Sequence, residues 1–121
     1  MKILVVSDIH YSLRQYDWLV REGSNHDLVI IAGDLLEMAS PVDLDTQASV
    51  VTQYFQRISA TTPLVVCSGN HDLLTDCNGI CSSEWLEDLA VPNLTVDLQS
   101  YRCPSLRILS FPWWSQEEEK A

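Results

Sequence analysis

The sequence predicts an α/β fold in which the strands of a parallel sheet alternate with helices. Three short apolar runs have the length and composition of buried strands: Ile3–Val6, Leu28–Ala32 and Leu64–Cys67. Two segments with helical spacing of apolar residues separate these runs. The resulting β-α-β-α-β order, with short connections, is typical of parallel strands joined by right-handed crossovers.

The first helix is predicted directly after the first strand. Ser12 is followed three residues later by a glutamine, which is the spacing of a capping box. Leu13, Tyr16 and Val20 fall on one helical face, which we expect to pack against the sheet. Gly23 is expected to end this helix.

The second helix has the clearest periodicity in the chain. Ser40-Pro41 and Asp43 are typical of a helix start. Apolar residues then recur at steps of four and three: Leu44, Ala48, Val51, Phe55 and Ile58. Thr62-Pro63 is expected to separate this helix from the third strand.

The pattern is weaker after the third strand. A loop is predicted from Asp72 to Cys81, followed by a short helix from Glu84 to Leu89 with Ser82 or Ser83 as its cap. Two weaker strands are expected downstream, near Leu94–Leu98 and Leu106–Phe111.

The last residues predict a fold that continues. Ser115 and Glu118 again have capping-box spacing, so a helix is expected to begin where the sequence stops. We therefore expect residues 1–121 to form a single, incomplete domain. Trp113 and Trp114 would then be exposed, and we expect self-association through this apolar surface.

Composition indicates an ordinary globular chain. Of the 121 residues 46% are apolar, and seven basic against seventeen acidic side chains give a net charge of −10. Such acidity disfavours nucleic acid as a partner. No run approaches the roughly 18 apolar residues of a membrane span, and the first strand is too short for a signal-peptide core, so we expect a cytoplasmic protein with no membrane contact. The four cysteines are then expected to be reduced thiols.

Polar residues that suit a metal centre follow each of the three predicted strands. These strings are Asp8-Ile9-His10, Gly33-Asp34 and Gly69-Asn70-His71-Asp72. The carboxyl ends of parallel strands open into one crevice, so these side chains can converge there. Asp8 and His10, at alternate positions, can bind one cation together, and Asp34 can bridge two cations. Asn70 can ligate through its amide oxygen, which leaves His71 free to donate a proton.

In order and spacing, the three strings resemble the signature of the calcineurin-like metallophosphoesterases. The resemblance implies a four-layer α-β-β-α sandwich, of which this chain would be the front half, truncated at its C-terminus. It also implies that Asp8 and His10 bind a first metal ion, that Asp34 bridges both ions and that Asn70 binds the second. Manganese is the expected metal, with iron, zinc or cobalt as alternatives.

The same resemblance implies a reaction. Metal-activated water would hydrolyse a phosphate mono- or diester of a small molecule, with His71 assisting the departing alkoxide as a catalytic residue. Asp72 matches a position of the catalytic motif, where we assign it a supporting role.

One departure from the family pattern leaves an alternative open. The later histidines of the family have no counterpart, because the one histidine of this sequence outside the three strings, His26, precedes Asp34. The second ion would have only Asp34 and Asn70 as protein ligands. A catalytically incomplete remnant that acts as a metal-binding or interaction module is therefore the competing interpretation.

Overall fold

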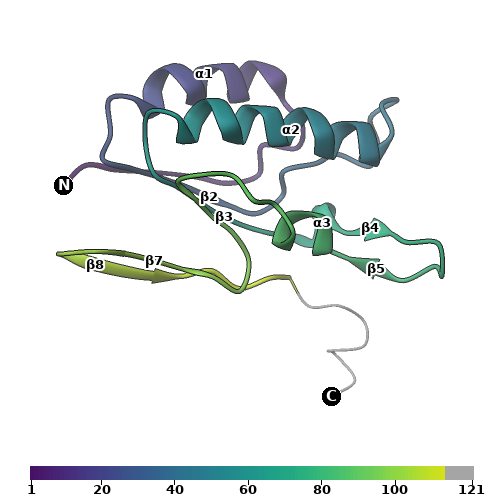
Figure 1. Cartoon of the computed structure of the whole chain (residues 1–121). Coiled ribbons are helices and arrows are strands. Elements are labelled where there is room, and N and C mark those ends of the chain that lie inside the picture. The colour runs from purple at the N-terminus through teal and green to yellow at the C-terminus, as the bar shows by residue number, and fades with distance from the viewer. Residues whose placement is uncertain (114–121) are drawn as a thin grey trace.

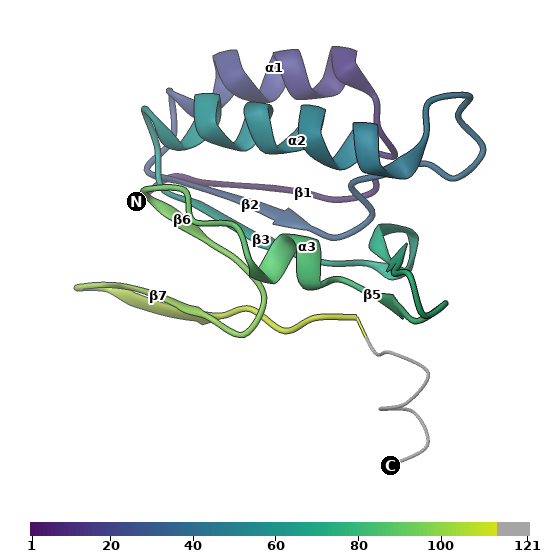
Figure 2. The ribbon, with the colours of Figure 1, turned by 45° about the vertical axis from the view of Figure 1, so that its right-hand side comes forward.

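The computed structural model describes residues 1–113 of the chain, which form three layers (Figure 1). The middle layer is a parallel sheet with strand order β1-β2-β3-β6, built from Ile3–Val6, Leu28–Ala32, Leu64–Cys67 and Leu94–Thr95. Helices α1 (Leu13–Gly23) and α2 (Leu44–Ser59) cover one face of this sheet, and the antiparallel hairpin of β7 (Ser100–Cys103) and β8 (Leu106–Leu109) lies on the other face (Figure 2). The mixed α/β fold with a parallel sheet is as predicted.

The core lies between the sheet and the two long helices. Its fully buried members on β2, β3, α1 and α2 are Tyr16, Leu19, Val29, Ile31, Val51, Phe55, Ile58, Leu64 and Val66. Apolar residues at helical spacing in α2 account for most of the helix side of this core, which confirms the periodicity.

Both long helices begin at the predicted caps. The Ser12 hydroxyl accepts from the backbone N–H of Gln15, and the Asp43 carboxylate accepts from the N–H of Thr46. Helix α1 ends at Gly23, as predicted. A Cβ at this position would come within 3.2 Å of the Val29 side chain, so the glycine allows the helix end to approach β2 closely.

Strand β1 is an edge strand and is not buried as predicted. Ile3 and Val5 are 39% and 60% exposed, whereas every side chain from Leu64 to Val66 in β3 is buried. The reason is topological. β1 has one sheet neighbour, and the face that carries Ile3 and Val5 is left uncovered by the described residues.

The segment after β3 contains more structure than predicted. Within the expected loop, Leu74–Thr75 (β4) pairs with Cys81–Ser82 (β5), and a 3₁₀ turn, η1, covers Asn70–Asp72. Helix α3 is short, Glu84–Glu87, and β7 was missed altogether. Strands of two to four residues that alternate exposed and half-buried positions carry too little periodicity to be recognised from sequence.

Two further predictions concern the termini and the membrane. The expected helix start at Ser115, and Trp114, lie outside the described residues, whereas Trp113 is 44% exposed as expected. Within residues 1–113 neither long helix has the length and apolar character of a membrane span.

Candidate metal centre

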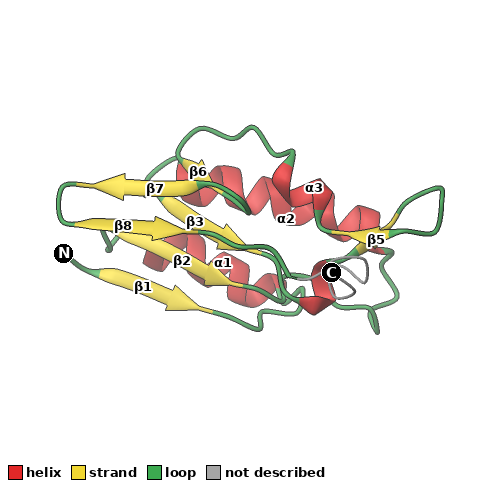
Figure 3. Cartoon of the chain, turned by 90° about the horizontal axis from the view of Figure 1, so that it is seen from below, coloured by secondary structure: helices red, strands yellow, loops and turns green. Residues whose placement is uncertain are grey.

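The carboxyl ends of β1, β2 and β3 meet at one edge of the sheet, because the three strands run in the same direction (Figure 3). Hydrogen bonds continue past the ends of the strands and join the loops that follow. The N–H of Asp8 donates to the carbonyl oxygen of Gly33 at 3.2 Å, and the N–H of His10 donates to that of Asp34 at 2.9 Å. The first two polar strings are thus held side by side by the backbone.

The backbone of these loops is strained. Asp8, His10, Tyr11 and Asp34 have φ values of 58°, 48°, 57° and 56°, in the left-handed region that residues with a Cβ rarely adopt. Such conformations persist only where the surrounding structure enforces them, and they concentrate at functional sites. The strain therefore marks this edge of the sheet independently of any motif.

One group of side chains has the chemistry of a cation site. Donor atoms of Asp8, His10 and Asp34 all lie within 4.8 Å of one another, and Nε2 of His10 is 3.5 Å from Oδ1 of Asp8. The Ser7 hydroxyl donates to Oδ2 of Asp8 at 2.7 Å, which lowers the pKa of the Asp8 carboxyl and keeps it ionised. Two carboxylates and an imidazole suit a borderline divalent metal.

A second group shares His10 and adds a residue that the sequence interpretation missed. Donor atoms of His10, Glu37 and His71 also lie within 4.8 Å of one another, and the rings of His10 and His71 meet edge to face at 4.7 Å. Glu37 follows Asp34 by three residues on the same loop. A carboxylate so close behind Gly33-Asp34 was the signal available in the sequence.

Two buried imidazole nitrogens support a charged or metal-binding role for this edge. Nδ1 of His10 and Nδ1 of His71 are both buried and have no hydrogen-bond partner within the part of the chain that the structure describes. A buried polar atom without a partner is costly and is typical of a functional site. The residues present therefore fit a cation at this edge.

The third polar string joins the first two through Asp34. Its Oδ1 accepts a hydrogen bond from the backbone N–H of His71 at 3.2 Å. Gly69 packs so closely on Asp34 that a Cβ on the glycine would overlap the Asp34 backbone and carboxylate. Asn70 lies exposed at the first position of η1, beside this contact. Its service as a metal ligand stays a prediction.

Asp72 links the loop after β2 to the loop after β3 through hydrogen bonds to its side chain. Its carboxylate is fully buried and accepts hydrogen bonds from the backbone N–H groups of Leu35, Leu36 and Gly69 at 2.7, 3.0 and 2.7 Å. Burial raises the pKa of the Asp72 carboxyl to about 6, against the opposing effect of these N–H donors. Each carboxylate oxygen accepts from the backbone, so Asp72 links the loops after β2 and β3, and its supporting role in the site stays a prediction.

Asp97, which the sequence interpretation did not single out, anchors the same region. Its buried carboxylate accepts from the N–H of Ser68 at 3.0 Å and from the hydroxyl of Ser83 at 3.3 Å. Ser83 is the N-cap of α3, as predicted, but its side chain makes no capping hydrogen bond, because its hydroxyl donates to Asp97 instead.

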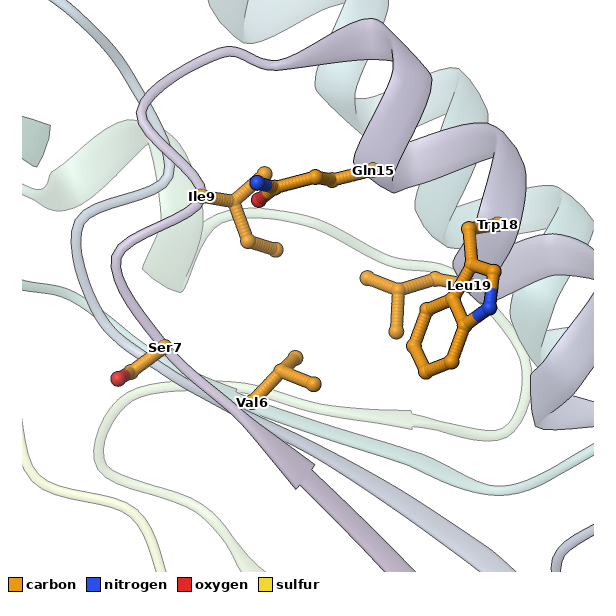
Figure 4. Close-up of a pocket in the computed structure, with 6 residues that line it drawn as sticks. All are labelled: Val6, Ser7, Ile9, Gln15, Trp18 and Leu19. Carbon is orange, nitrogen blue, oxygen red and sulfur yellow. The ribbon is translucent and has the colours of Figure 1, made fainter.

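An apolar hollow of about 350 Å³ opens between β1 and α1 (Figure 4). The residues that line it are Val6, Ser7, Ile9, Gln15, Trp18 and Leu19. None of these side chains is an acid or an imidazole, so the hollow is not the metal centre.

Comparison with known families agrees with this geometry. The family model described as calcineurin-like phosphoesterase matches residues 1–118. No curated protein matches the chain.

Proposed function

Because this chain belongs to the calcineurin-like phosphoesterase family, a family of metal-dependent phosphoesterases, we propose that it hydrolyses phosphate mono- or diesters with two divalent cations. The observation that carries the proposal is the convergence of Asp8, His10 and Asp34, with donor atoms within 4.8 Å of one another. The partner is then a small phosphoester. A net charge of −10 argues against nucleic acid as the substrate.

Four residues would hold the cations: Asp8, His10 and Asp34 the first, and Asp34 with Asn70 the second. Bound cations would supply positive charge to the phosphate oxygens and activate a water for attack on phosphorus. Manganese fits a mixed carboxylate, amide and imidazole set, as do iron, zinc and cobalt.

The protein's own contribution is to position these groups before substrate arrives. The hydrogen bond from the His71 backbone to Asp34 ties the proton donor to the ligand that would bridge the cations. The His71 ring lies against the His10 ring, so a phosphoester held by the cations would lie beside His71. We propose that His71 gives its proton to the leaving oxygen. Asp72 acts on this step only by fixing the loops.

Manganese-stimulated hydrolysis of an aryl phosphate monoester and diester tests the proposal. We expect Asp34→Asn and His71→Gln to lower turnover at least tenfold, since the first removes a ligand charge and the second a proton donor. Asp88→Asn, an exposed aspartate distant in sequence from every motif, is the control and should leave the rate unchanged. Full activity in both site variants would refute the assignment.

The competing candidate is a metal-binding or interaction module without turnover. It is favoured by the ligand assignment proposed above, in which the second cation has only Asp34 and Asn70, too few ligands for tight binding. Isothermal titration with manganese separates the two functions. Two tight sites per chain support the enzyme, whereas one weak site or none supports the module.

A further inference from the structure

We propose that the outer face of α1 carries a second ligand site, which binds a small aromatic anion. Trp18 stacks on the ring of this ligand, and the guanidinium groups of Arg14 and Arg21 hold its phosphate or carboxylate group. The inference goes beyond the proposed function and does not depend on it, because the site uses none of the residues proposed as metal ligands.

The first support is the shape of the surface along α1. A hollow of about 650 Å³ lies there, and its lining residues are Ser12, Arg14, Gln15, Trp18 and Arg21. It adjoins the apolar hollow between β1 and α1, because Gln15 and Trp18 line both (Figure 4). Sites for small ligands have volumes of about 300–1,000 Å³, so the two hollows together can hold a ligand with an apolar end and a charged end.

The second support is the spacing of the basic side chains. Arg14, Trp18 and Arg21 are separated by four and three positions, so all three lie on the same face of the helix. The ion pairs within residues 1–113 both belong to His10, and the cation–π contact there belongs to Arg57. Arg14 and Arg21 are therefore exposed and have no acidic or aromatic partner among these residues.

The third support is the position of the nearest acid in the helix. Asp17 lies three residues after Arg14 and four before Arg21, which is the spacing of an ion pair with either one. Its Oδ1 instead accepts a hydrogen bond from the hydroxyl of Tyr54 on α2 at 2.8 Å. The contact between the two helices thus takes the acid that would neutralise the arginines, and their positive charge remains available to an anion.

The chemistry of these side chains defines the class of ligand. A guanidinium group presents a planar pair of donors that matches the oxygens of a phosphate or a carboxylate. Trp18 is 43% exposed and offers the face of its indole to another ring. About one helical turn separates Trp18 from each arginine, so a ring with an anionic substituent can contact all three. Nucleoside monophosphates and aromatic carboxylic acids share this chemistry.

The first measurement is the indole Nε1–H signal of Trp18 in ¹H–¹⁵N NMR spectra of the full chain. EDTA is present throughout, so that no metal-dependent turnover consumes the probe. The chain has four tryptophans, and the Trp18 signal is assigned by its loss in Trp18→Phe. The probes are adenosine 5′-monophosphate and 1-naphthoate, with adenosine and 1-naphthalenemethanol as their uncharged counterparts.

We expect at least one of the two anions to shift the Trp18 signal saturably, and its uncharged counterpart to bind at least tenfold more weakly. A shift with the nucleotide alone identifies a nucleotide site, a shift with naphthoate alone identifies a site for aromatic acids, and shifts with both identify a site for either. Absence of a saturable shift with both anions would overturn the proposal. Equal affinity for an anion and its uncharged counterpart would also overturn it, because the arginines would then contribute nothing.

The second measurement is the affinity of arginine variants for the anion that binds. Arg14→Gln and Arg21→Gln should each weaken binding about fivefold, as expected for an exposed ion pair, and the double variant should weaken it further. Arg107→Gln is the matched control, since it removes an equal charge from an exposed position of β8 and should change the affinity less than twofold. An equal loss in Arg107→Gln would overturn the proposal, because the anion would then respond only to the overall charge of the chain.

Discussion

Removal of the Asp72 carboxylate should both destabilise the fold and loosen the metal centre. Asp72 is fully buried and satisfies three backbone N–H groups from two loops. A buried donor left without a partner costs about 1–3 kcal/mol, so the loss of an acceptor for three donors in Asp72→Ala should lower the free energy of unfolding by at least about 3 kcal/mol. Asp72→Asn keeps one acceptor oxygen but turns an NH₂ group toward a backbone donor, and should cost about 1–3 kcal/mol.

Urea denaturation followed by circular dichroism measures this loss, and the fluorescence of Trp85 offers a local probe because its Nε1 donates to the Asp72 carbonyl oxygen at 2.7 Å. Asp88→Asn, at an exposed position, should remain within about 0.5 kcal/mol of the wild type. An Asp72→Ala variant as stable as this control would refute the view that Asp72 joins the loops. A ranking with Asn less stable than Ala would refute the hydrogen-bond argument behind the magnitudes.

Three further outcomes are expected. Gly69→Ala should weaken manganese binding at least tenfold by isothermal titration, because the new Cβ would displace Asp34; unchanged affinity would contradict the close packing seen here. Cys103 should be alkylated at lower pH than Cys67, as followed by peptide mass spectrometry, because hydrogen bonds from the neighbouring serine lower the pKa of the Cys103 thiol and burial raises that of Cys67. Alkylation of Cys67 at lower pH than Cys103 would contradict the effects assigned to burial and hydrogen bonding on the two thiol pKa values. Asp43→Ala removes the N-cap of α2 and should cost about 1 kcal/mol in thermal or chemical denaturation, and no loss would mean that the cap contributes nothing.

The elements that the sequence predicts well are those whose signal is local and long. The apolar spacing from Leu44 to Ile58 recurs over several turns, and α2 follows it. In strand β7 the side chains alternate between exposed and half-buried positions over only four residues, which is too short a pattern to predict a strand. The strand forms because it pairs with β8. The exposure of β1 is also invisible in its sequence, since Ile3–Val6 is as apolar as the buried strands and differs only in its place at the sheet edge.

The same distinction holds at the metal centre. Asp8, His10 and Asp34 were predicted because each follows directly on a predicted strand, and parallel strands bring their carboxyl ends together. Glu37 was missed because its place depends on the buried Gln47 of the next helix and not on a strand end.

The sequence by itself determined the order of strands and helices, the family, and which polar residues stand at the strand ends, because these depend on neighbours within a few positions along the chain. Only the tertiary structure decided that Glu37 faces His10, that Asp72 is enclosed by three backbone donors, and that Asp97 anchors the end of β3. These contacts join residues far apart in sequence. They exist only once sheet register and helix packing have set the distances between loops, and short-range pattern carries no information about those distances.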